Sequence, residues 1–425
     1  MCPVASVWCF FLKRTSSLGF IFVTLLIDAL GISLLIPILP EFIAHLGKHT
    51  LSESAQDYGR IMALYGAMQF LFAPALGMLS DRYGRRPVLL ISLLCAALDY
   101  VMMALAPSLI FLYIGRMISG ITGANFTAAT AYIADVSPPE KRAQNFGLIG
   151  AAFGVGFVIG PAIGGILGDW MGPRFPFWVA AGLCFANFLY GWFILPESHK
   201  PENRRQSLTL REANPIGVLR VLGKYPVVWG LTGALVATNL AMYCINSTWV
   251  LFTQVRFDWT PKQVGFSLAA FGAMALIYQL GLARIIFPAL GERKVMVIGM
   301  TVAAIEFVAY AFASQGWMIY LIMIVGGIGM LGGQAVQGFL SRQVSETEQG
   351  ALQGGLTSLM SLTGIFGPII GTALFSYFTG DQTTLYLPGV SFLLAALLNM
   401  IALAITLRVL MRSRNKTSDL QISTS

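Results

Sequence analysis

Charged residues are scarce in this chain. Asp, Glu, Lys and Arg together make up 11% of its 425 residues, whereas a soluble globular domain usually carries about 25%. Hydrophobic residues account for 56%, and the mean hydropathy is +0.73. This composition excludes an ordinary soluble domain and indicates a membrane protein.

Cysteine and histidine are also few, with five and three residues. The cysteines are odd in number, lie in or beside apolar segments and show no paired metal spacing, so we expect neither a disulfide framework nor a metal site. The chain also lacks the HExxH and GxSxG motifs of hydrolytic enzymes. We therefore expect no enzyme and no cofactor. The alternative, an intramembrane enzyme, would need a nucleophile with its base or a metal constellation.

Long apolar runs take the place of charge. A membrane-spanning helix needs about 20 apolar residues to cross roughly 30 Å of hydrocarbon. The sequence predicts twelve such spans, near residues 18–40, 58–78, 87–106, 108–134, 145–168, 176–195, 226–253, 264–286, 294–313, 317–340, 350–378 and 384–411. The expected fold class is an all-α membrane protein with twelve transmembrane helices.

The basic residues report topology. The net charge of +8 could suggest a nucleic-acid partner, but Lys and Arg gather in the even-numbered connections and at the two termini. This is the positive-inside pattern, which predicts that both termini are cytoplasmic. We read no cleavable signal peptide, because no small-residue cleavage site follows the first span. We therefore expect no nucleic-acid partner.

The chain repeats itself. "GRIMALYGAMQ" (59–69) and "GFSLAAFGAMA" (265–275) share Gly, Ala and Gly-Ala-Met at equal spacing, and "GPAIG" (160–164) matches "GPIIG" (367–371) 207 positions later. An internal duplication of six helices leaves both halves in one orientation, related by a pseudo-two-fold axis along the membrane normal. The predicted domains are a first six-helix bundle (1–197), a cytoplasmic linker (198–224), a second bundle (225–412) and a cytoplasmic tail (413–425).

One connection has a specific motif. "GMLSDRYGRRP" (77–87) joins the second and third spans, and an ordinary positive-inside loop is the other interpretation. The pattern resembles the signature loop of the major facilitator superfamily. The candidate gating residues are Gly77, Asp81, Arg82, Gly84, Arg85 and Arg142.

The resemblance implies that Asp81 binds an arginine and the positive N-terminal end of the eleventh predicted span (350–378), near Gly350, and so latches the two halves in the outward-facing state. Arg142 is the expected arginine. The second-half counterpart, 288–295, keeps Gly291 and two basic residues but has no aspartate. We expect a weaker latch there.

A glycine pattern marks the fifth span. "GAAFGVGFVIGPAIGG" (150–165) follows no predicted strand, which excludes a dinucleotide-binding loop, and small residues four apart let helices pack closely. The stretch also resembles the motif of drug/proton antiporters within the superfamily. Its candidate residues are Gly154, Gly156, Gly160, Pro161 and Gly164.

Two opposite charges fall inside predicted spans. Counting about 1.5 Å per residue from each span start, Asp99 and Arg116 both lie about 12 Å from the outer face. An isolated charge at this depth is costly, so we expect the two to pair. A carboxylate that exchanges arginine for a proton would couple transport to protons. A purely structural ion pair is the alternative.

Further polar residues lie in spans. Asp28 lies near the midplane of the first span, and Glu306 is the repeat equivalent of Asp99, 207 positions later. We expect the Asp28 carboxylate to face a cavity, because lipid exposure is prohibitive, and Glu306 gives the second half a buried acid at the depth of Asp99. Gln69, Asn125 and Gln334 could line a cavity or form hydrogen bonds between helices.

From about residue 18 to 371 the chain resembles the tetracycline/proton antiporters of the superfamily's twelve-helix branch. The segments that carry this resemblance include "DALGISLLIPILP", "LYIGRMISGITGAN", "AYIAD", "LPESHK" and "LQGGLTSL". The resemblance implies a monomeric, proton-driven exporter of a drug or small organic molecule in the plasma (inner) membrane, with no cofactor beyond the proton gradient. Asp28, Asp81, Asp99 and Arg116 occupy positions that this family uses.

The chain departs from the family at two positions. Tetracycline exporters typically carry a histidine where this chain has Ala275, and an aspartate where it has Ala303. Those groups are linked to metal-tetracycline handling and proton movement, so the substrate is open. A metabolite or siderophore, including uptake of one, is the alternative, and a receptor without transport is a third.

Overall fold

The structure is a computed structural model that describes residues 3–123, 125–138, 141–199, 202, 226–343, 349–380 and 383–422. Within these ranges its side chains are described from 18 to 411, except at 125–126, 142–144, 226–227 and 349–351. Every regular element in the described ranges is a helix. Twelve helical segments there are long and apolar enough to cross a membrane, which confirms the predicted fold class.

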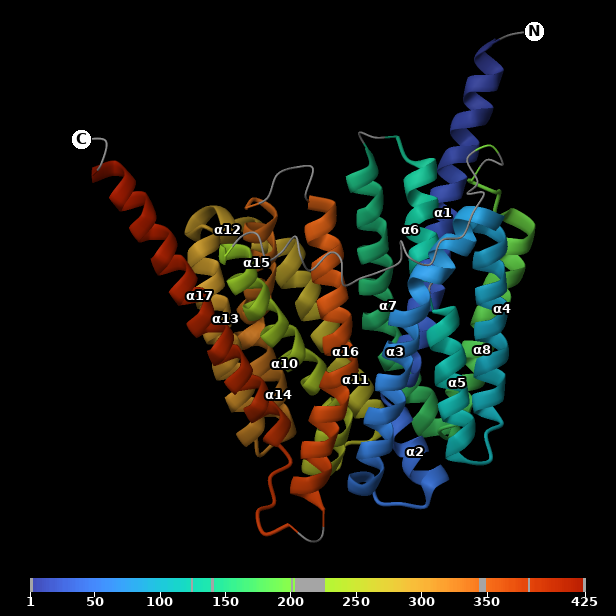
Figure 1. Ribbon diagram of the computed structural model, residues 1–425. Coiled ribbons are helices and arrows are strands. Elements are labelled where there is room, and N and C mark those ends of the chain that lie inside the picture. Colours follow the sequence, from blue (N-terminus) through green and yellow to red (C-terminus); the bar gives the residue numbers. More distant parts are fainter. Residues whose placement is uncertain are drawn as a thin grey trace. The chain divides into compact units, whose positions relative to one another are not determined.

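Most helices follow the predicted spans closely (Figure 1), but α3 begins seven residues before the predicted 58 and α17 begins six residues after the predicted 384. The first half contains α1 (Pro3–Leu35), α2 (Leu39–Gly47), α3 (Leu51–Tyr83), α4 (Arg85–Ala104), α5 (Leu109–Thr122), α6 (Asn125–Val136), α7 (Arg142–Met171) and α8 (Phe175–Ile194). The second half contains α10 (Pro226–Phe257), α11 (Pro261–Leu276), α12 (Ala283–Leu290), α13 (Glu292–Phe312), α14 (Gly316–Gly326), α15 (Met330–Ser341), α16 (Gln349–Thr379) and α17 (Val390–Ile422).

The chain divides into two compact units, each described below by itself. Unit 1 comprises Met1–Lys48, Leu64–Ala213 and Thr260–Gly272. Unit 2 comprises His49–Ala63, Asn214–Trp259 and Ala273–Ser425. The first turns of α3 and α11 therefore each belong to the unit of the opposite half of the chain.

The first span ends earlier than the sequence predicted. Helix α1 stops at Leu35, whereas the prediction ran to residue 40. Pro37 and Pro40 cause the difference, because proline has no backbone N–H to continue a helix but suits the first turn of a new one. Pro40 accordingly lies in the first turn of the short helix α2, which starts at Leu39.

Three other spans are locally irregular. The fourth is interrupted at Gly123, between α5 and α6. The eighth contains a π-helical segment, Ile277–Leu282, between α11 and α12. There Tyr278 donates a hydrogen bond from its hydroxyl to the carbonyl oxygen of Ile324 at 2.5 Å. The tenth contains a 3₁₀ turn, Gly327–Gly329, between α14 and α15.

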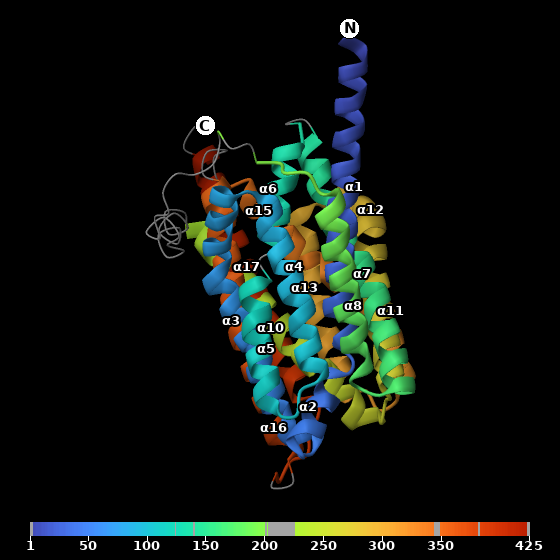
Figure 2. The same cartoon turned by 90° about the vertical axis from the view of Figure 1, so that its right-hand side faces the viewer.

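In unit 1, helix α1 packs on α7 and α8, and α4 packs on α5 and α8. In the view of Figure 2, α4, α5 and α8 face the viewer. The α7 glycines allow the close approach to α1. A Cβ on Gly156 would lie 2.5 Å from Cβ of Ala29, and the Ser33 hydroxyl of α1 donates to the Gly156 carbonyl oxygen at 2.9 Å. Gly160 and Gly164 lie against Ser33 and Leu34 in the same way. The predicted close packing at this glycine pattern is therefore present.

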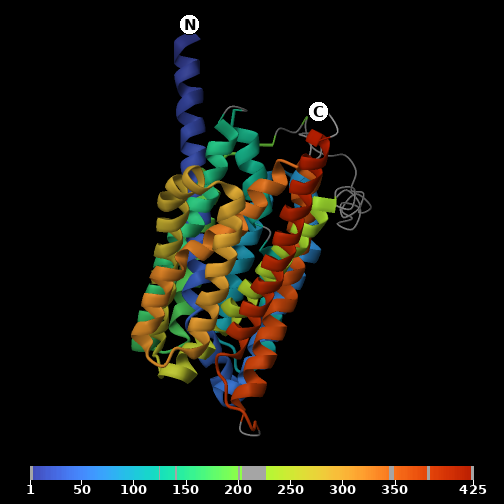
Figure 3. The ribbon, with the colours of Figure 1, turned by 90° about the vertical axis from the view of Figure 1, so that its left-hand side faces the viewer.

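In unit 2, helix α10 packs on α16 and α17, and the red α17 crosses the unit along its length in Figure 3. Two α16 glycines repeat the α7 contact. A Cβ on Gly367 would lie 2.5 Å from Cβ of Tyr243, and one on Gly371 would lie 2.8 Å from the carbonyl oxygen of Cys244. Gly367 and Gly371 follow Gly160 and Gly164 by 207 positions, so the sequence repeat is also a repeat of helix contacts.

Candidate functional site

Asp99 is buried on α4 of unit 1, where its side chain is held by α5. The Ser119 hydroxyl donates a hydrogen bond to Oδ2 of Asp99. Oδ1 is buried and has no hydrogen-bond partner among the described residues. Gly115 leaves room for this oxygen, because a Cβ there would lie 2.7 Å from it. Unsatisfied buried carboxylate oxygens are rare and costly, so Oδ1 is the atom of this site that still lacks a donor.

Arg116 lies nearby on α5 but does not bond to Asp99. Its Nη2 lies 3.1 Å from Sδ of Met103, and its Cζ lies 6.0 Å from the centre of the Tyr65 ring. Its Nε is buried without a hydrogen-bond partner in the described part of the chain. No ion pair within 4.0 Å joins the two described charges, so the direct contact that we expected is absent from this structure.

Asp28 belongs to the same group of side chains. It is half-buried on α1, and both it and Asp99 lie within electrostatic range of the Cys184 thiol on α8. A Cβ on Gly31, one helical turn after Asp28, would lie 3.7 Å from both Sγ of Cys184 and the hydroxyl of Tyr100. One turn after Asp28, helix α1 therefore passes close to Tyr100 of α4 and Cys184 of α8.

The three predicted polar residues have different outcomes. The Gln69 amide on α3 donates to the Gly123 carbonyl oxygen at 3.4 Å, where α5 ends, which is a hydrogen bond between helices. Gln334 on α15 is exposed. The side chain of Asn125 lies outside the described residues.

Glu306 is the buried acid of unit 2. The Tyr310 hydroxyl, one turn further along α13, donates to its Oε1 at 3.0 Å. The Tyr310 ring packs edge-on against Trp249 at a centroid distance of 5.4 Å. Gly326 makes room for the carboxyl group, since a Cβ there would lie 2.7 Å from Oε2.

The repeat shows how the two acid sites differ. Gly326 follows Ser119 by 207 positions and Tyr310 follows Met103 by the same number, so the hydroxyl donor has moved from the neighbouring helix to the acid's own helix. Met323 stands at the position equivalent to Arg116. Unit 1 thus has an acid near a cation, and unit 2 has an acid among aromatic rings.

The motif loop forms a cluster of charges at one end of unit 1. Asp81 makes an ion pair with Arg85, with Oδ1 and Nη1 2.5 Å apart. Arg85 also binds Asp135 on α6 through Nε at 3.2 Å, and it donates from Nη1 to the Ser80 hydroxyl at 2.9 Å. Gly84 has φ = 105°, a conformation that favours glycine and permits the sharp turn between α3 and α4.

The other gating residues are peripheral to this cluster. Gly77 lies beneath it, where a Cβ would contact Thr127 at 3.5 Å. The exposed Arg82 lies over the ring of Tyr83 at 5.5 Å. The side chain of Arg142, the expected partner of Asp81, lies outside the described residues, so that pairing stays a prediction.

Two acidic residues of this cluster escaped the sequence reasoning. The Asp135 carboxylate forms the ion pair with Arg85 and also accepts a hydrogen bond from the Ser198 hydroxyl at 3.1 Å. Glu197, just beyond α8, accepts the backbone N–H of Arg85 at 2.9 Å and that of Arg86 at 3.3 Å. The signal was present, because both acids stand at predicted span ends within "AYIAD" and "LPESHK".

Comparisons with known proteins agree with this picture. A family model described as "Major Facilitator Superfamily" matches residues 21–290 and 289–422. The chain is 44% identical over 368 residues to the class C tetracycline resistance protein of Escherichia coli, covering 86% of this chain and 91% of that protein. It is 42% identical to the class G protein of Vibrio anguillarum, covering 83% of this chain and 89% of that protein.

Solved structures show the same fold. The human organic anion transporter MFSD10 (TETRAN) superposes with a TM-score of 0.68 at 23% identity, covering 92% of this chain and 99% of that one. A bacterial homologue of the human lysosomal transporter Spinster, inward-facing and unoccupied, gives 0.75 at 17% identity, covering 93% and 97%. The extent of the family match and the identity to the resistance proteins together show that this chain belongs to the major facilitator superfamily, in its tetracycline resistance family.

Proposed function

We propose that this protein exports a drug or small organic molecule across the inner membrane in exchange for protons, with Asp99 as the principal proton-binding group. The observation that carries the proposal is the buried Asp99 carboxylate, whose Oδ2 accepts from Ser119 while Oδ1 has no partner among the described residues. The membership of the resistance family supports the direction of transport.

The mechanism follows from the neighbours of Asp99. Arg116 lies close enough to act on the carboxylate electrostatically without bonding to it. A small movement of α5 against α4 would bring the guanidinium onto Oδ1, and the reverse movement would leave that oxygen to a proton. Since opposite charge favours the ionised acid and its withdrawal favours the neutral one, such a movement would load and release a proton in each cycle.

Asp28 and Glu306 have supporting roles in this proposal. Asp28 shares the electrostatic environment of Asp99 and is the candidate for substrate contact in unit 1. Glu306 is a second proton site, whose only hydrogen-bond donor among the described residues is Tyr310. Alternating access would use the predicted bundles 1–197 and 225–412, with both termini cytoplasmic and a monomer as the functional unit.

The substrate is proposed to differ from a metal-tetracycline chelate. Ala275 and Ala303 stand where the family typically has a histidine and an aspartate, and a methyl group can neither bind a metal chelate nor carry a proton. Ala303 instead packs against Gly329, and a Cβ added to Gly329 would lie 3.0 Å from the Cβ of Ala303. Weak tetracycline export is therefore expected from a chain whose remaining machinery belongs to this family.

Everted membrane vesicles test the proposal. Respiration acidifies their lumen, and an exported drug that enters the lumen in exchange for protons raises luminal pH, which a fluorescent probe reports. We expect this response from the wild type with at least one drug of a panel, and its loss in Asp99→Asn. Asp57→Asn is the matched control, because Asp57 pairs with Arg60 in the opening turns of α3, at 3.3 Å. An unchanged response in Asp99→Asn would contradict the assignment.

A further inference from the structure

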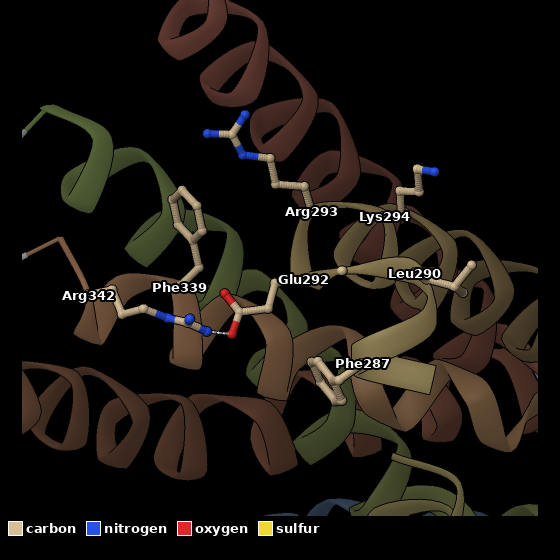
Figure 4. A pocket seen from close by; sticks show the side chains of 8 residues that line it. Phe287, Leu290, Glu292, Arg293, Lys294, Phe339 and Arg342 are labelled. Carbon is tan, nitrogen blue, oxygen red and sulfur yellow. Dashed lines mark ion pairs between the residues drawn. The ribbon is translucent and has the colours of Figure 1, made fainter. Parts of the chain in front are cut away.

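A pocket of about 610 Å³ opens in unit 2 where α12 turns into α13, beside the end of α15. Its charged lining consists of Glu292, Arg293, Lys294 and Arg342, and its aromatic lining includes Phe287 and Phe339 (Figure 4). None of these residues belongs to the proton sites described above.

The pocket carries an excess of positive charge. Glu292 forms an ion pair with Arg342, and Figure 4 shows the two side chains directed at each other. Arg293 and Lys294 are exposed and extend away from that pair. The Arg293 guanidinium lies over the Phe339 ring at 5.9 Å. Three cations against one carboxylate leave two positive charges, carried by Arg293 and Lys294.

The pocket lies at the level where membrane spans end. The candidate spans Pro261–Leu290 and Glu292–Phe312 meet at Gly291, which turns the chain with φ = 75°. Phe287 and Leu290, in the last turn of α12, give the pocket an apolar wall on the side of the spans. Cations above an apolar wall match a phospholipid, whose phosphate lies just outside the hydrocarbon.

The first half of the chain shows what occupies the equivalent place. There the Glu197 carboxylate accepts the backbone N–H groups of Arg85 and Arg86, at the start of α4. Glu292 and Arg293 follow these residues by 207 positions, and α13 starts there without a side-chain cap. Glu197 reaches its place because the chain leaves α8 at Ile194, whereas α17 continues as a helix to Ile422. The described residues of unit 2 therefore supply no such carboxylate.

We propose that this pocket binds the phosphate of an anionic membrane phospholipid, such as phosphatidylglycerol, in the place that Glu197 fills in the first half. Arg293 and Lys294 contact the phosphate oxygens, and Phe287 and Leu290 face the glycerol and the first methylenes of the acyl chains. Glu292 limits the affinity, because it repels the phosphate and keeps Arg342 occupied.

The test titrates phosphatidylglycerol with short acyl chains into the purified full-length protein in a neutral detergent and follows thermal unfolding. Phosphatidylcholine with the same chains is the lipid control, and inorganic phosphate at millimolar concentration is the soluble-anion control. We expect a saturable stabilisation by phosphatidylglycerol alone. The double variant Arg293→Gln with Lys294→Gln should weaken the apparent affinity for phosphatidylglycerol about thirty-fold, which corresponds to ~1 kcal/mol per basic residue at a membrane surface.

Two further variants make the test specific. Lys141→Gln with Arg408→Gln removes the same charge from two exposed positions outside the pocket and should leave the apparent affinity within about two-fold of the wild type. Glu292→Gln should tighten binding several-fold, because it frees Arg342 and removes the repulsive carboxylate.

Four results would each overturn the proposal. They are an equal response to phosphatidylcholine, an equal response to inorganic phosphate, an equal loss in the Lys141 and Arg408 control, and weaker binding by Glu292→Gln.

Discussion

Asp81 and Asp135 share one guanidinium, and this shared contact makes the effects of removing them separable. The Arg85 side chain is only 9% exposed, whereas the side chains of Asp81 and Asp135 are 38% and 24% exposed. Asp81→Asn leaves Arg85 with Asp135 and Ser80, so the loss should be that of a partly exposed ion pair, at most about 1 kcal/mol. Asp135→Asn leaves Arg85 with Asp81 and should cost about the same.

The double variant Asp81→Asn with Asp135→Asn should lose more stability than the two single variants lose together. Removing both carboxylates leaves a buried guanidinium without an acidic side-chain partner, a situation that costs about 3–5 kcal/mol in proteins. Two single losses of about 1 kcal/mol therefore predict an interaction energy of at least roughly 1 kcal/mol. Denaturant unfolding of the four proteins in detergent measures this interaction energy, and Asp57→Asn is the control, because it removes a similarly half-buried acid that is paired with the exposed Arg60.

Transport should separate from stability in the same series. Asp81→Asn should insert and fold normally and yet abolish transport, because the latch depends on this carboxylate, whereas Glu292→Gln should keep transport. Additive losses in the double variant would refute the shared-guanidinium account. Normal transport by Asp81→Asn would refute the latch.

The remaining predictions concern the two acid sites. Ser119→Ala should remove the donor to Asp99 and lower drug-dependent proton movement in everted vesicles severalfold, whereas unchanged movement would show the hydrogen bond to be incidental. Gly115→Ala should push the Asp99 carboxylate aside and lower the free energy of unfolding by about 1–3 kcal/mol. Gly182→Ala, with open space around it, should leave stability unchanged. Equal melting temperatures of the two variants would contradict this prediction. Expression should confer weak or no tetracycline resistance, and Glu306→Gln should partly reduce transport of any exported drug; strong magnesium-dependent tetracycline efflux would show that the substrate proposal is wrong.

Hydropathy predicted the twelve spans because the bilayer fixes their length and composition, and both are written locally in the sequence. The irregular helical segments, by contrast, depend on contacts with residues that are distant in the sequence. The π-helical segment at 277–282 places the Tyr278 hydroxyl on the Ile324 carbonyl oxygen, and the break at Gly123 brings α5 against Gln69 of α3. Each depends on a helix distant in sequence, so periodicity alone gives no sign of it.

The candidate site was predictable in depth but not in contacts. Counting residues placed Asp99 and Arg116 at one level, yet Ser119 takes the carboxylate and Met103 takes the guanidinium. Such contacts depend on the direction of each side chain, and the depth of a residue in the membrane does not determine that direction. Asp135 was within reach of the sequence, because it directly follows the predicted fourth span, within "AYIAD".

The exchange of drug for protons through Asp99 is tested most directly with purified protein in liposomes. A drug gradient is imposed across the membrane without a pH gradient, and a trapped pH-sensitive dye records proton movement. Drug leaving the lumen should acidify it in the wild type, and Asp99→Asn should show no pH change. Alkalinisation of the lumen would mean that drug and proton move together, and acidification that persists in Asp99→Asn would assign proton transfer to another group.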